Sequence, residues 1–259
     1  GKKTVKELVV CQAVKQAFNR VREKGFDIED FWSHSLAVAT AGRILSLPLS
    51  KDKRTREQER EFKALKLDGE TVEALQRLHL RDHLELGNED PFIGGMMHDI
   101  GKVAMAVSYP GIFEQVVEEM RNNAWQLSML AAEKRVSGAV VHTEVGKILA
   151  KAWGLGELLE RTVSHHHQFA EDDQMSALIA TADFVATAAH PFPKEAASPM
   201  VRLSGGEATP ELLSGAVEFL PPGLLEALQT EMDQLVDLSK TLVPVIRRSV
   251  KDLRESMKG

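Results

Sequence analysis

The sequence has one cysteine, no long apolar run and no excess of basic residues. Cys11 therefore has no partner for an intrachain disulfide, and a single thiol is typical of a reducing, cytoplasmic setting. No apolar run approaches the ~20 residues that a membrane-spanning helix needs, and no cleavable signal stands at the amino end, so we expect no membrane. The net charge of −6 lacks the basic footprint of a nucleic-acid binder, and we expect no nucleic-acid partner.

Strand signals and several catalytic signatures are also missing. The sequence has no Asn-Gly hairpin turn, no Walker-type glycine loop, no G-x-S-x-G elbow and no dinucleotide fingerprint. Apolar residues instead recur at the intervals of a helix, as in the stripe Val5, Leu8, Val9, Val14 and Phe18. We therefore predict an all-α protein. The expected helices lie near 3–23, 30–47, 70–86, 90–100, 110–122, 125–135, 139–152, 156–168, 174–189 and 222–256.

Composition divides the chain into a helical body and a tail. We expect one helical domain over 1–190, interrupted by an insertion at about 49–88. The stretch KDKRTREQERE in this insertion mixes five bases with four acids, which is typical of a solvated helix. Residues 191–259 are predicted to form a loop rich in Pro, Gly and Ser and a C-terminal helical extension. The extension carries an apolar stripe that we expect to pack on the body or on a second copy in a homodimer: Leu224, Leu225, Leu228, Met232, Leu235 and Leu238.

Histidines and aspartates are scattered over five of the expected helices. Imidazole nitrogens and carboxylate oxygens are the ligands that Zn, Mn and Fe accept. His34 stands three residues after Phe31 and four before Val38, so it points with them toward the core. Glycines lie three or four residues from His98 and His142, which leaves room for something other than side chains or allows close helix packing. The candidate metal ligands are His34, His98, Asp99, His142, His166, His167 and Asp183.

The stretch SHHHQ contains three consecutive histidines, and the preceding helix indicates which of them face inward. Leu155, Leu159 and Val163 form its buried stripe at spacings of four. His166 and His167 stand three and four residues after Val163 and continue this inward face. His165 falls toward the edge and is a weaker candidate.

Neighbouring residues of a helix point about 100° apart, so His98 and Asp99 reach one ion only if the helix ends beside them. Gly101 is a candidate for the glycine that follows a helix end. Lys102 then places a cation near whatever the ion holds, where it would steady a phosphate oxygen.

The stretch MMHDIGK at 96–102 resembles the HD superfamily of metal-dependent phosphohydrolases, which is named for its His-Asp pair. Four further stretches resemble the HDOD family, the HD-related output domains of bacterial signalling proteins. These are DFWSHSLAVAT at 30–40, YPGIFEQVV at 109–117, AAEKRVSGAVVHTEVGKILAKAWGLGELLERTVSHHHQ at 131–168 and TADFVA at 181–186. The resemblance covers about 3–190 apart from the charged insertion.

The resemblance implies an HD-domain-like helical bundle that acts in bacterial signal transduction as a phosphohydrolase or a regulatory output module. The seven candidate ligands match the ligand order of the related HD-GYP phosphodiesterases, and Asp30 matches a further carboxylate ligand there. Two departures stand out. HD-GYP enzymes hydrolyse cyclic di-GMP and carry a Glu and a Gly-Tyr-Pro motif after the double histidine, whereas QFAEDD stands there in this sequence. The amino-terminal part of the family domain is also expected to be absent from this sequence.

Two functions remain open, beside a third interpretation of the chain as a purely structural helical bundle with core histidines. The first is a metal-dependent phosphohydrolase with one or two divalent ions (Fe, Mn or Zn), acting on a phosphorylated small molecule or a nucleotide. Asp99, Lys102 and His166 are then the catalytic candidates, with His166 or His167 as general acid if a single ion is bound. His98, Asp99, His142 and Asp183 would hold the first ion, the two aspartates would bridge, and the remaining histidines would add a second. The alternative is a signalling module without turnover that contacts a signalling protein and retains a vestigial or structural site.

Overall fold

The computed structural model describes residues 26–78, 86, 90–168, 170, 173–207 and 209–256. Within these ranges the chain is all-α, as predicted, with no strand. The expected helix at 3–23 lies outside the described residues. The helices are α2 (Ile28–Ser46), η1 (Lys51–Lys53), α3 (Arg56–Leu65), α4 (Gly69–Gln76), α5 (Pro91–Met97), α6 (Ile100–Ser108), α7 (Pro110–Asn122), α8 (Met129–Ser137), α9 (His142–Ala152), α10 (Glu157–His165), α11 (Gln174–Ala189), α12 (Pro199–Ser204), α13 (Pro210–Val217), α14 (Leu224–Ala227) and α15 (Met232–Ser256).

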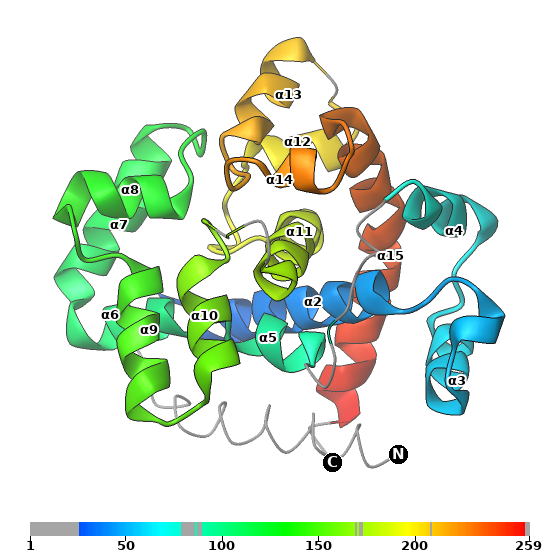
Figure 1. Cartoon of the computed structure of the whole chain (residues 1–259). Helices are drawn as coiled ribbons and strands as arrows, with labels where there is room; N and C mark the ends of the chain where they lie inside the picture. The colour runs from blue at the N-terminus through cyan, green and yellow to red at the C-terminus, as the bar shows by residue number, and fades with distance from the viewer. Residues whose placement is uncertain are drawn as a thin grey trace.

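Helix α2 lies at the centre of the bundle and packs against α5, α11 and α15 (Figure 1). Its sequence explains this position, because nearly every residue from Phe31 to Leu45 is buried and the helix has no solvated stripe. The carboxylate of Asp27 accepts from the backbone nitrogens of Glu29 and Asp30 and so fixes the start of the helix. α2 therefore presents His34 to the interior at a fixed height.

Two groups of helices flank this centre. Helices α6 to α9 lie on one side and the insertion helices α3 and α4 on the other (Figure 1). Helix α9 packs against both α6 and α10, and α7 packs against α8. The insertion is tied to the body by an ion pair between Arg43 and Glu61 and by a hydrogen bond from Arg248 to the backbone oxygen of Leu65.

The tail packs on the body, where α15 contacts α11, α2 and α4 and buries Leu235, Leu238 and Leu242. The predicted single helix at 222–256 is wrong, because the chain turns between α14 and α15. Gln229 has a positive φ of 48°, and the side chain of Gln234 accepts from Thr230 and from the backbone nitrogen at 231, which starts a new helix. The segment after His190 was predicted to be a loop rich in Pro, Gly and Ser, but it contains all of α12, and α13 starts at its end.

Candidate metal centre

The structure brings all seven candidate ligands to one place in the interior. Five elements and turns supply them, and the side chains at 34, 98, 99, 142 and 166 are buried, whereas those at 167 and 183 are half-buried. The ligands are His34 on α2, His98 and Asp99 between α5 and α6, His142 at the start of α9, His166 and His167 just after α10, and Asp183 on α11.

His98 and Asp99 reach the same point because the chain turns between two helices. Helix α5 ends at Met97 and α6 begins at Ile100, so the pair occupies the junction. The predicted helix end beside this pair is confirmed, but the role given to Gly101 is wrong. Gly101 lies in the first turn of α6, where a Cβ atom would stand 1.9 Å from the backbone oxygen of His142. Glycine is required there because α6 and α9 approach backbone to backbone.

The other glycines near the candidate ligands also serve close packing. A Cβ at Gly95 would lie 2.6 Å from the backbone of Ala39, and one at Gly146 would lie 2.5 Å from Val163 Cγ1. Gly138 instead ends α8 with a φ of +70°. Of the two explanations for these glycines, helix packing is the one that the structure supports.

The donor atoms form two groups that share one carboxylate. In the first group, Asp99 Oδ1 lies 3.4 Å from His142 Nε2 and 3.5 Å from His166 Nε2, and His167 completes the group. In the second group, Asp183 Oδ1 lies 3.2 Å from His34 Nε2 and 3.8 Å from His98 Nε2.

The other oxygen of the shared carboxylate faces the second group. Asp99 Oδ2 lies 3.3 Å from His98 Nε2 and 3.7 Å from His34 Nε2. Asp99 is therefore placed between the groups, whereas Asp183 belongs to one of them. This partition differs from the expected one, in which His98 and His142 share an ion and Asp183 is a second bridge.

Hydrogen bonds at the outer ring nitrogens fix the tautomers of four histidines. His142 Nδ1 lies 2.7 Å from Glu133 Oε2, and the Nδ1 atoms of the other three lie 2.7–3.2 Å from backbone oxygens. Carboxylates and carbonyls only accept, so each Nδ1 carries a proton, and in the neutral form of each ring the lone pair is on the Nε2 that faces the centre. The carbonyl partners are His190 for His34, Gly95 for His98, and Thr162 and Val163 for His166.

The Nε2 atoms face one another in a buried space. His142 Nε2 and His166 Nε2 lie 3.4 Å apart, and each bears a lone pair when its ring is neutral. The Nε2 atoms of His34 and His98 and Oδ1 of Asp99 are also buried and form no hydrogen bond with a described residue. Unpaired buried acceptors are costly, and a divalent ion would satisfy them, because neutral imidazole and carboxylate are ligands for Zn, Mn and Fe. The donor set fits one or two such ions.

Burial and neighbouring charges shift the protonation of the site. Burial lowers the pKa of His166 to about 4, and it also lowers the pKa of His167 well below its ordinary value. Burial opposes ionisation of Asp99, but His98 and the ammonium of Lys102, which bonds to Asp99 Oδ2, lower its pKa. Lys102 in turn has a raised pKa, since the attraction of Asp99 and Asp183 outweighs its burial.

Several further residues near the site lie outside the two donor groups. His165 is exposed and turns away, in line with the register of α10. Asp30 is half-buried and belongs to neither donor group. Glu133 is fully buried and was not among the predicted site residues. The sequence pattern could have identified Glu133, because it stands four residues after the buried Met129 and thus places an acid on an apolar helical face. The carbonyl of His190 has no such signal, because any residue supplies one.

The bundle and its paired donor groups define an all-α protein with an interior His/Asp cluster of the HD type. The chain belongs to the HDOD domain family, which matches residues 1–64 and 70–169. A solved HDOD domain protein of unknown function from Geobacter sulfurreducens is similar over 98% of this chain and 72% of its own, with a TM-score of 0.59 and 22% identity.

A second solved structure comes from Shewanella amazonensis SB2B, and its name gives phosphohydrolase as a proposed activity. It is similar over 93% of this chain and 73% of its own, with a TM-score of 0.50 and 20% identity. At these identities the two structures support the fold. No curated protein matches the sequence. None of the described helices has the length and apolar character needed to traverse a bilayer.

Proposed function

We propose that this HDOD protein is a metal-dependent phosphohydrolase that acts on a phosphorylated small molecule or a nucleotide in bacterial signalling. Membership of the HDOD family and the likeness to a protein named for this activity support the proposal. One observation carries it: the buried Nε2 atoms of histidines from four different elements converge on Asp99, and each of these rings has its Nδ1 bonded to an acceptor. A packed core without a ligand has no need for that arrangement.

The position of each residue indicates its role in the proposed reaction. His142, His166 and His167 would hold one ion and His34, His98 and Asp183 another, with Asp99 between them. Ions bound there would supply Lewis acidity for attack on a phosphoester. Lys102 lies in the same cavity as His34 and Asp183, where its ammonium can bind a phosphoryl oxygen. His166 is better suited to ligation than to acid catalysis, because its low pKa keeps the ring neutral.

Elemental analysis of protein purified without added metal tests the first half of the proposal. We expect at least one transition-metal ion per chain, and its loss in His98→Ala and Asp99→Ala. His165→Ala is the matched control, because this exposed histidine adjoins the site in sequence and points away from it.

Hydrolysis of p-nitrophenyl phosphate and bis(p-nitrophenyl) phosphate by the metal-loaded protein tests the second half. Turnover should fall by at least about a hundredfold in Asp99→Ala and stay unchanged in His165→Ala. Equal turnover in the two variants would contradict the proposal.

One contact favours a second candidate, a signalling module without turnover. The Lys102 ammonium is bonded to Asp99 Oδ2, the oxygen that faces the second donor group, so a cation already partly neutralises that group. A metal-replete protein that hydrolyses neither ester would support this module, which would then act through contacts with a signalling protein.

A further inference from the structure

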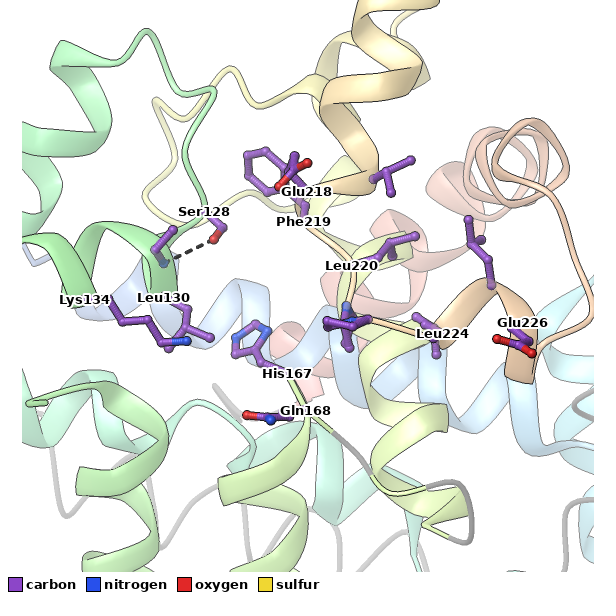
Figure 2. Close-up of a pocket in the computed structure, with 16 residues that line it drawn as sticks. Ser128, Leu130, Lys134, His167, Gln168, Glu218, Phe219, Leu220, Leu224 and Glu226 are labelled. Atoms are coloured by element: carbon purple, nitrogen blue, oxygen red, sulfur yellow. Dashed lines mark hydrogen bonds between the residues drawn. The ribbon is translucent and has the colours of Figure 1, made fainter. Parts of the chain in front are cut away.

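Two cavities adjoin beside the donor groups. The smaller, of about 80 Å³, reaches His34, Lys102 and Asp183. The larger, of about 740 Å³, is open between the start of α8 and residues 217–226. His167 and Phe219 line both cavities, so the two meet at these side chains. Figure 2 shows His167 between Leu130 and Lys134 on one side and Leu224 on the other, with Phe219 across the opening.

The smaller cavity is lined by a hydroxyl group that has no hydrogen-bond partner among the described residues. Ser198 is 4% exposed, and its Oγ forms no hydrogen bond with any residue described. It directly precedes α12 but does not cap it. A buried hydroxyl without a partner costs free energy, which a ligand oxygen accepting its proton would recover. Ser198 and Lys102 line the same cavity, so both can bind one phosphoryl group.

The volumes assign the parts of an ester to the two cavities. About 80 Å³ admits a phosphoryl group but not a sugar or a base. The larger cavity falls within the range of ~300–1,000 Å³ that small-molecule pockets occupy. A phosphate ester held at the donor groups must therefore place its organic part in the larger cavity.

The charged residues that line the larger cavity limit the charge that the organic part of the ester can carry. Lys134 is exposed on one wall, and Glu218 and Glu226 are exposed on the other. In the described part of the chain, none of the three takes part in an ion pair. Two carboxylates against one ammonium disfavour a second phosphate, whereas carboxylate oxygens accept from hydroxyl groups. The half-buried ring of Phe219 offers an apolar surface at the junction.

We infer that the two cavities form one subsite for an ester with a single phosphoryl group and a neutral, hydroxyl-bearing organic part. Ser198 binds the phosphoryl group, and residues 217–226 hold the organic part. The inference rests on the proposed function and names the substrate class. Both Ser198 and residues 217–226 lie beyond the residues that the HDOD family matches, so substrate choice is set by the tail.

Calorimetric binding to the full chain loaded with Mn²⁺ tests the subsite without requiring turnover. Thymidine 5′-phosphate should bind at least about tenfold more tightly than inorganic phosphate, and more tightly than thymidine 3′,5′-bisphosphate. Ser198→Ala should weaken both inorganic phosphate and thymidine 5′-phosphate by about tenfold. Ser204→Ala is the matched control, because its Oγ on α12 is equally unpaired but does not line the cavity.

A charge reversal on the exposed wall tests the organic part of the subsite independently of core folding. Glu218→Lys should bind the bisphosphate at least about tenfold more tightly than wild type. Glu255→Lys, the same change at the far end of α15, should have no effect.

Equal affinity for inorganic phosphate and thymidine 5′-phosphate would overturn the inference, as would identical binding by Ser198→Ala and Ser204→Ala. A protein that shows the expected binding but hydrolyses no ester would keep the subsite and contradict the proposed hydrolysis. A protein that hydrolyses p-nitrophenyl phosphate without these differences in binding would do the reverse.

Discussion

Replacing Gly101 by alanine tests whether the approach of α6 to α9 holds the two donor groups together. A Cβ at this position would stand 1.9 Å from the backbone oxygen of His142 and 2.7 Å from the backbone nitrogen of Gly146. Both are main-chain atoms, so no side-chain rotation relieves the clash. Ordinary contact begins at 3.4 Å. The two helices must therefore separate by about 1.5 Å, because close-packed interiors cannot absorb such an overlap.

The separation has two consequences of different size. Overpacking of a core costs about 1–3 kcal/mol and occasionally more, while the better helix propensity of alanine returns about 1 kcal/mol. Because the clash is with backbone, we expect Gly101→Ala to lower the free energy of unfolding by about 2 kcal/mol. Asp99 would also move away from His142 by far more than the ~0.2 Å that metal–ligand distances tolerate. Metal affinity should fall by at least about tenfold.

Urea unfolding of the metal-free protein measures the first effect, and competitive titration with a chelator measures the second. Gly111→Ala on α7 is the matched control, because a Cβ there meets nothing within 4 Å. It should change the free energy of unfolding by less than about 1 kcal/mol and leave metal affinity intact. If Gly101→Ala unfolds and binds metal like Gly111→Ala, the contact between α6 and α9 does not position the site.

Three further changes probe the electrostatics. Glu133→Gln weakens the hydrogen bond that orients His142, and titration should show metal affinity about 10- to 100-fold lower. Lys102→Met should lower turnover by about a hundredfold without loss of bound metal, since Lys102 neutralises Asp99 but is no ligand; metal loss would contradict this. In metal-free protein the folded pKa of His166 is about 4 against an ordinary 6.5, so the unfolded chain binds the extra proton between these values. The free energy of unfolding should fall by about 3 kcal/mol as the pH drops through that window, and urea titrations at pH 7 and 4 should show a smaller drop in His166→Gln.

Periodicity indicated that His34, His166 and His167 face inward, because helical register is a local property. The pair at 98–99, His142 and Asp183 were chosen by residue type, by neighbouring glycines and by the family resemblance. Leu159 and Val163 indicate which histidines of SHHHQ face inward, and the exposure of His165 agrees with that register. Contacts between helices are not local. The turn at His98 could be expected from the need of both side chains to reach one point, but the reason for Gly101 lies in α9, some forty residues away in sequence. A glycine that ends a helix and a glycine that admits another backbone look the same in the sequence.

In the tail, the amino-acid composition gave a wrong prediction of secondary structure. Proline and serine suggested a loop after His190, yet Pro199 and Pro210 each occupy the first turn of a short helix, where proline needs no hydrogen-bond partner for its nitrogen. Conversely, the unbroken apolar stripe predicted one long helix from 222, and the turn at Gln229 interrupts it. The spacing of apolar residues does not reveal a single residue with positive φ, so the turn could not be predicted from it. These two errors concern the segment that lines the proposed subsite.

The orientation of the histidine rings supports the proposed metal site more directly than the ligand pattern does. A His/Asp pattern persists in sequence whether or not an ion binds, so by itself it does not indicate metal binding. The Nδ1 protons, in contrast, are held by Glu133 and by backbone oxygens of three different elements, and all four rings turn Nε2 inward. Rotating a ring to bring its protonated nitrogen to Asp99 would break the bond that its Nδ1 makes with Glu133 or a backbone oxygen. With both rings neutral, His142 Nε2 and His166 Nε2 keep two lone pairs 3.4 Å apart in the buried interior, and the cation of the proposed metal site would offset that repulsion.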